Sequence, residues 1–170
     1  NNSPEGGAVI EVRLPAAAGT AVEPEVPKAA PRLHEGAVHG RVLLVEEEEA
    51  VLEFERDVLA GAGATVITAK TGQDVKTRLL SEQFDAVIMN GKMPDQWTAK
   101  ESYPWLKENC PGMQGHVLYT FSNGVEPTDG RAFLQESHVP YLVKPFEVAE
   151  LISQARKLLQ KAQAAGAGAD

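Results

Sequence analysis

Short apolar runs alternate with longer amphipathic segments from about residue 41 onward. In five of these runs consecutive positions are apolar, as expected for parallel strands that are covered on both faces. The runs are Val42–Val45, Thr65–Ile67, Ala86–Met89, Val117–Phe121 and Tyr141–Val143. We therefore predict five strands in this part of the chain.

Apolar residues at helical spacing occupy the segments between these strands. Val51, Phe54 and Val58 share one helical face, and apolar residues recur three or four positions apart from Val148 to Leu159. The alternation of strand and helix predicts an α/β fold with a doubly wound, five-stranded parallel sheet and flanking helices. In such folds the functional crevice lies at the carboxyl ends of the strands.

Residues 1–40 do not follow this pattern. Residues 1–15 contain the apolar-rich stretch Ala8 to Leu14, which predicts one strand closed by Pro15. Residues 16–40 are rich in Ala, Pro, Glu and Gly, so we predict a linker, whose simplest role is that of a spacer. We expect one domain over residues 41–162, and residues 163–170 to begin a second linker.

Composition narrows the class of protein. A chain of 170 residues with 43% hydrophobic content can bury the core of one domain. The net charge of -8 argues against binding of a nucleic acid polymer, because no basic excess is present to neutralise phosphates. Cys110 is the only cysteine, which fits a reducing cytoplasm. No apolar run approaches the roughly 18 residues that span a bilayer, so we expect no membrane contact.

The chain contains four separated motifs, which are Val42–Glu48, Ala86–Pro94, Ser122 and Lys144–Phe146. In their order and approximate spacing they resemble the signature of response-regulator receiver domains, which have a flavodoxin-like fold. The resemblance covers about residues 40–162. It implies a site where an aspartate at the end of the third strand accepts a phosphoryl group. Mg²⁺ would be held there by that carboxylate and by an acidic pair after the first strand.

The sequence departs from the family at the residues that would carry this chemistry. Asn90 stands at the acceptor position, and a neutral carboxamide cannot act as the anionic nucleophile. Glu46 and Glu47 replace the acidic pair with longer side chains, which suits octahedral Mg²⁺ poorly. The resemblance gives Ser122 and Lys144 the role of binding phosphoryl oxygens. We therefore predict a degenerate phosphorylation site with no catalytic residue, no metal and no cofactor, and no enzyme activity in this fragment.

Other interpretations of these residues remain open. Glu46 and Glu47 are also favourable as negative charges at a helix N-terminus. Lys144 is either a partner for one of these glutamates or a contact for an anionic ligand. Asp95, in the loop after the third strand, is the alternative acceptor. A conventional phosphorylated receiver with an unusual acceptor or Mg²⁺ site is thus the alternative function.

The start of the chain carries a second resemblance. Glu5 to Pro15 is similar to the last strand of a histidine-kinase ATPase domain. Kinase tail, linker and receiver follow one another in this order in hybrid histidine kinases, which implies that the parent protein is such a kinase. The expected partners are then the kinase core and a second receiver of the same chain. We predict a pseudo-receiver that regulates the kinase by docking within two-component signalling.

Basic and aromatic residues are predicted to gather on one face near the end of the domain. Arg131, Tyr141, Lys144, Pro145 and Arg156 are the candidate ligand contacts. Some degenerate receivers of hybrid kinases bind cyclic di-GMP, so the resemblance implies this compound as a regulatory ligand. Its phosphates would pair with the cations and a base would stack on the tyrosine. The simpler interpretation is a solvated charged face.

Overall fold

A computed structural model describes residues 38–123 and 128–166. Its strands are β1 (Arg41–Val45), β2 (Thr65–Ala69), β3 (Ala86–Asn90), β4 (Val117–Ser122) and β5 (Tyr141–Lys144). Its helices are α1 (Glu49–Gly61), α2 (Gly72–Ser81), α3 (Ala99–Asn109), α4 (Thr128–Glu136) and α5 (Val148–Gly166), with a 3-10 turn at Pro111–Met113. The five predicted strands are confirmed, each one or two residues longer than the apolar run that predicted it.

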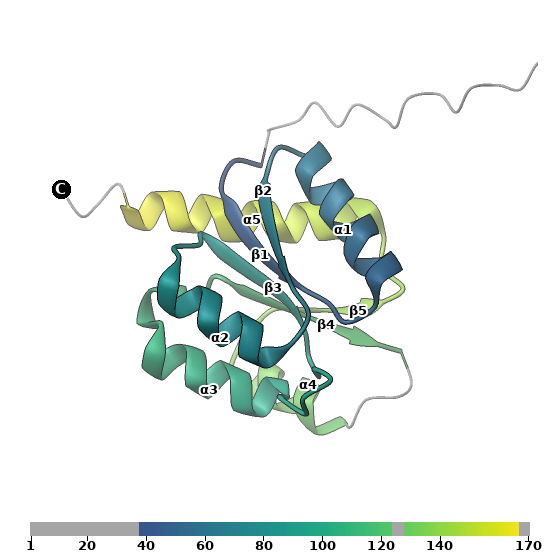
Figure 1. Cartoon of the computed structure of the whole chain (residues 1–170), viewed down its shortest axis with the longest axis vertical. Coiled ribbons are helices and arrows are strands. Elements are labelled where there is room, and N and C mark those ends of the chain that lie inside the picture. Colours follow the sequence, from purple (N-terminus) through teal and green to yellow (C-terminus); the bar gives the residue numbers. More distant parts are fainter. Residues whose placement is uncertain (1–37, 124–127, 167–170) are drawn as a thin grey trace, which may run out of the picture. The chain divides into compact units, whose positions relative to one another are not determined.

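The five strands form one parallel sheet in the order β2-β1-β3-β4-β5. Figure 1 shows α1 and α5 on one face of this sheet and α2, α3 and α4 on the other. The predicted doubly wound α/β fold is therefore confirmed. The register pairs Val45 with Met89 and Ser122 with Lys144, so the carboxyl ends of β1, β3, β4 and β5 lie along one edge.

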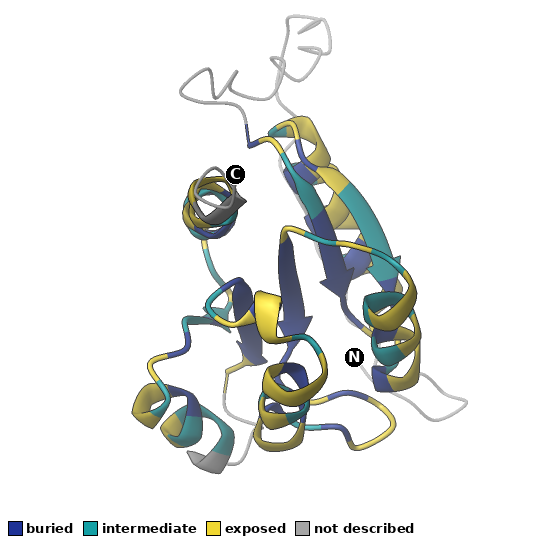
Figure 2. Cartoon of the chain, turned by 90° about the vertical axis from the view of Figure 1, so that its left-hand side faces the viewer, coloured by how far each residue is buried: buried dark blue, intermediate teal, exposed yellow. Residues whose placement is uncertain are grey.

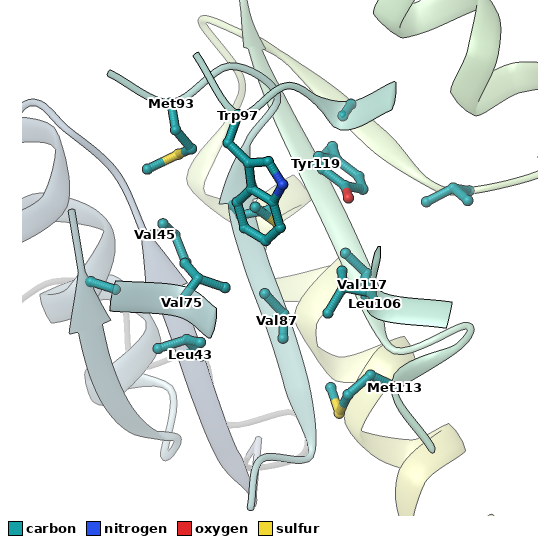
Figure 3. Close-up of a cluster of buried hydrophobic side chains, with 14 of the residues drawn as sticks. Leu43, Val45, Val75, Val87, Met93, Trp97, Leu106, Met113, Val117 and Tyr119 are labelled. Atoms are coloured by element: carbon teal, nitrogen blue, oxygen red, sulfur yellow. The ribbon is translucent and has the colours of Figure 1, made fainter. Parts of the chain in front are cut away.

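Side chains of the sheet enter two separate cores, because successive residues of a strand point to opposite faces. Val87 and Met89 pack beneath α2, α3 and α4, together with Trp97 from the loop after β3 (Figure 3). Ala86 and Ile88 pack beneath α1 and α5. Figure 2 shows the resulting pattern, in which the inner strands are buried along their length. The strands are continuous apolar runs in the sequence because helices cover both faces of the sheet.

The apolar face expected on the first helix is only partly the face that it buries. Val58 packs partly buried against the core, but Phe54 is 54% exposed. The residues that α1 buries are Leu52, Glu55 and Leu59. This face includes a glutamate, so a pattern built from apolar residues alone selects the neighbouring stripe instead.

The limits of the domain also differ from the predicted ones. Val38 is only 2% exposed, and its backbone N–H donates to the Ala62 carbonyl at 2.8 Å, so the predicted linker 16–40 ends before Val38. At the other end α5 continues to Gly166, beyond the predicted boundary at residue 162. The strand predicted within residues 1–15 lies outside the described residues. In the part that is described, no helix has the length and apolar character needed to cross a membrane.

Replacing Val38 with Ala tests this boundary. We expect the free energy of unfolding to fall by about 1–2 kcal/mol, because buried methyl groups are lost from the core beneath α1 and α5. Val148→Ala is the matched control, since Val148 is 37% exposed at the start of α5. Urea unfolding of both variants gives the comparison, and equal effects would mean that Val38 is not part of the folded domain.

Candidate functional site

Three of the predicted site residues lie at strand ends on the same face of the sheet. Glu46, Asn90 and Lys144 each come two positions after a strand residue that packs beneath α1 and α5. Since side chains alternate along a strand, all three leave the sheet on this face. The backbone N–H of Glu46 still donates to Ala69 at 3.2 Å, which continues the ladder between β1 and β2. The fold thus brings together polar residues from distant parts of the chain.

Glu46 is fully engaged in contacts with its own chain. The residue is 3% exposed, and its Oε1 accepts from the backbone N–H groups of Glu47 and Glu48 at 3.0 and 3.1 Å. These amides directly precede α1, where backbone donors lack helical partners. Its Oε2 accepts from the Lys144 ammonium. Glu46 therefore has two roles: it places a negative charge at the N-terminus of α1, and it pairs with Lys144.

Lys144 contacts a second carboxylate, which sequence reasoning missed. Its Nζ lies 3.3 Å from Glu55 Oε1, and the Lys144 side chain is only 20% exposed. The two groups form an ion pair, and no other hydrogen-bond partner for the buried Glu55 Oε1 is found among the described residues. We call Glu46, Glu55 and Lys144 the buried charge cluster. The only sequence signal for Glu55 is its spacing, three residues after Leu52 and four before Leu59.

Burial acts directly on the ionisation of Glu55. Loss of water around the side chain raises the pKa of its carboxyl group above 4.5, its usual value, and the Lys144 charge opposes this rise. The neighbouring Glu46 carboxylate raises the pKa further. Ionised Glu55 is therefore costly in this place, and Lys144 offsets part of that cost.

Asn90 places a neutral amide at the position of the acceptor. The residue is 7% exposed, and its Oδ1 is buried with no hydrogen-bond partner in the described part of the chain. Gly91 follows, and a Cβ there would overlap the ring of Phe121. The end of β3 is thus tightly packed around a side chain that has no anionic oxygen for attack on phosphorus.

The residues present fit Mg²⁺ poorly. Both oxygens of Glu46 are already used by backbone amides and by Lys144. Asn90 offers one neutral oxygen, and Glu47 is exposed. The Lys144 ammonium also places a positive charge beside Glu46, where a cation bound to that carboxylate would be repelled. Over residues 38–123 and 128–166, no cluster of at least three His, Cys, Asp or Glu side chains has an arrangement that could bind a metal ion.

Asp95, the alternative acceptor, binds the backbone at the start of α2 and not the residues at the end of β3. Its Oδ2 accepts from the backbone N–H of Gln73 at 3.2 Å, at the start of α2. Asp95 is exposed in the loop after β3. It therefore supports the N-terminus of a helix on the face opposite to the buried charge cluster.

The predicted ligand residues do not gather in one place. Tyr141 packs its ring edge against Phe121 at 5.9 Å, and its hydroxyl accepts from Gln135 Nε2 of α4 at 2.7 Å. This is the face of the sheet opposite to Lys144, because the two residues lie three positions apart in β5. Arg131 lies on α4, on the same side of the sheet as Tyr141, whereas Arg156 lies on α5, on the opposite side.

Three further predicted positions can be placed. Ser122 is exposed at the end of β4, in register with Lys144. Pro145 is exposed and follows a cis peptide bond. The Nε of Arg156 is buried and lacks a hydrogen-bond partner within the described residues.

Strand order, the position of the polar strand ends and the retained lysine define a receiver-type domain of two-component signalling. The chain belongs to the response regulator receiver domain family, whose profile matches residues 42–156.

Known proteins agree with this assignment. Response regulator MprA of Mycolicibacterium vanbaalenii is 29% identical over 121 residues, which cover 71% of this chain and 51% of MprA. KDP operon transcriptional regulatory protein KdpE of Escherichia coli is 28% identical over 120 residues, covering 71% of this chain and 51% of KdpE. The chain therefore spans about half the length of the curated relatives it matches.

Solved structures show the same fold. The receiver domain of a putative LuxO repressor from Vibrio parahaemolyticus superposes with a TM-score of 0.68 at 19% identity, over 78% of this chain and 98% of that domain. Full-length FixJ from B. japonicum gives a TM-score of 0.66 at 19% identity, over 75% of this chain and 61% of FixJ. At such identities the likeness concerns the fold alone.

The raised pKa of Glu55 gives a stability that depends on pH. A carboxyl group that binds its proton more tightly when folded contributes fully below pH 4.5, the usual pKa, and this contribution is lost as the pH rises toward the folded pKa. We expect the free energy of unfolding of the wild type, relative to Glu55→Gln, to decrease as the pH rises above 4.5. Urea unfolding at several pH values measures the difference.

Glu53→Gln is the control, because Glu53 is exposed on the same helix. A difference between the wild type and Glu55→Gln that stays constant or increases with pH would contradict the pKa shift.

Proposed function

We propose that this receiver domain accepts no phosphoryl group and regulates by docking on its partners. The observation that carries the proposal is the buried neutral amide of Asn90 at the acceptor position. The buried charge cluster supports it, because Lys144 already has two carboxylates and needs no phosphoryl oxygen to balance its charge. The poor fit to Mg²⁺ points the same way.

Regulation without phosphorylation requires two docked arrangements of different free energy. A partner or ligand that binds one arrangement better shifts the population by that difference. We propose that the partners are the core of a hybrid histidine kinase and a second receiver in the same chain, and that the protein works in the cytoplasm. The resemblance of Glu5 to Pro15 to a kinase strand supports this setting.

The alternative function is that of a conventional receiver with an unusual acceptor. It is supported by the names of the curated relatives, which are response regulators and transcriptional regulatory proteins.

Freshly prepared wild-type protein should gain no acid-labile mass when incubated with acetyl phosphate and Mg²⁺, because Asn90 cannot form an acyl phosphate. Fresh protein is needed, since the Asn90-Gly91 pair is prone to deamidation, which would create a carboxylate. Intact-mass spectrometry makes the measurement. A gain of one phosphoryl group would favour the alternative function, and its loss in Asp95→Asn would identify the acceptor.

Cyclic di-GMP binding is the second part of the proposal. Tyr141 is half-buried, so part of its ring is open to a stacking base. Arg131 lies four residues before Gln135 on α4, on the side of the helix whose Gln135 binds the tyrosine hydroxyl. These two residues support a contact with one base and one phosphate. Lys144 supports it less, because its ammonium lies between Glu46 and Glu55.

Calorimetry with cyclic di-GMP tests this ligand. We expect Tyr141→Ala to weaken binding by roughly 1–3 kcal/mol through lost stacking, and Arg131→Gln to cost a charge-assisted contact of about 1.5–3 kcal/mol. Lys157→Gln is the control for charge, because Lys157 is exposed on α5. Absence of binding at ligand concentrations of about 1 mM would remove the ligand and leave docking alone.

A further inference from the structure

Glu55 occupies a position in α1 that suits an apolar side chain. It is 2% exposed, and its neighbours on the buried face, Leu52 and Leu59, are 3% and 0% exposed. An ionised group in such a place is costly unless an opposite charge accompanies it. An apolar side chain of similar size would fill the position at lower cost. The packing of α1 alone therefore does not account for a carboxyl group here.

The carboxyl group finds its counter-charge on a distant strand. Glu55 Oε1 lies 3.3 Å from Lys144 Nζ at the end of β5, and the same ammonium contacts Glu46 after β1. Asn90, at the end of β3, adds no charge because a carboxamide is neutral. The lysine thus takes one carboxylate from the end of β1 and one from α1.

We propose that Glu55 is a positioning residue that holds the Lys144 ammonium in place of the carboxylate absent at Asn90. The inference rests on the proposed function, in which the domain works without phosphorylation. Through Lys144, Glu55 then links α1 to the ends of β1 and β5. The charge of Lys144 is balanced in this cluster without a phosphoryl group. A new carboxylate at position 90 would have to compete with Glu46 and Glu55 for a single lysine.

Competitive acylation with acetic anhydride measures how firmly the Lys144 proton is held. The neutral amine attacks the anhydride, acetate leaves, and the ammonium proton goes to water, so a nearby carboxylate that stabilises the ammonium slows the reaction. We expect Glu55→Gln to raise the acylation rate of Lys144 about tenfold relative to exposed Lys157 in the same protein. Peptide mass spectrometry after brief labelling gives both rates.

Two control variants separate charge from packing. Glu53→Gln removes an exposed charge from α1, and Leu52→Val loosens the buried face without changing charge. Both should leave the ratio of Lys144 to Lys157 acylation as in the wild type. An unchanged ratio in Glu55→Gln, or an equal rise in Leu52→Val, would overturn the proposed role of Glu55.

A second experiment asks whether Glu55 stands in for the missing carboxylate. Asn90→Asp is combined with either Glu55→Gln or Glu53→Gln, and both double variants are incubated with acetyl phosphate and Mg²⁺. Transfer forms a bond between a carboxylate oxygen of the new side chain and phosphorus, and releases acetate. We expect the variant with Glu55→Gln to gain its phosphoryl group about tenfold faster, because one of the two carboxylates that compete for Lys144 is then removed.

Equal rates in the two double variants, including the absence of transfer in both, would overturn the claim that Glu55 replaces the acceptor carboxylate. Phosphorylation of the wild-type protein would instead refute the proposed function. It would leave the acylation result for Glu55 intact, so the two failures can be told apart.

Discussion

The ion pairs of Lys144 organise the site, because an ammonium group with little access to water is stabilised by neighbouring carboxylates. It reaches Glu46, which also binds the backbone amides before α1, and Glu55 within α1 itself. The Lys144 side chain from β5 therefore contacts one carboxylate just before α1 and one within α1. Such buried pairs are weak contributors to stability when compared with apolar packing, but the loss of one member leaves an uncompensated charge.

This arrangement depends on the parallel sheet. The order β2-β1-β3-β4-β5 places β3 and β4 between the strands that carry Glu46 and Lys144. These two intervening strands end in uncharged residues, Asn90 and Ser122. In a receiver that is phosphorylated, the resemblance implies a carboxylate in place of Asn90 and a lysine that serves the phosphoryl group. In this domain the lysine forms an ion pair with Glu55 of α1.

Much of the fold could be predicted from the sequence, because the sheet is covered on both faces and its strands are continuous apolar runs. The polar strand ends Glu46, Asn90 and Lys144 could be identified from their motifs. Glu55 could not, because a charged residue in a helix is expected on the solvated side. The apolar face that includes Phe54 was the more visible sequence signal, yet Phe54 is 54% exposed. Val38 was missed since one apolar residue in a linker-like composition gives no periodic signal.

The motifs in the sequence likewise did not predict that Tyr141 and Lys144 lie on opposite faces of the sheet. The two residues are three positions apart, and only the alternation of a strand places them on opposite faces. The predicted ligand set combined both faces, whereas the contacts of Tyr141 belong to α4 and β4.

The most direct test of the central claim is a crystal structure of the fresh protein grown with Mg²⁺ and beryllium fluoride, which mimics a phosphoryl group on a carboxylate. We expect the Asn90 side chain to carry no beryllofluoride and Lys144 Nζ to lie between the carboxylates of Glu46 and Glu55. Beryllofluoride at residue 90, with Mg²⁺ bound by Glu46 or Glu47 and Lys144 turned toward the fluorides, would contradict it.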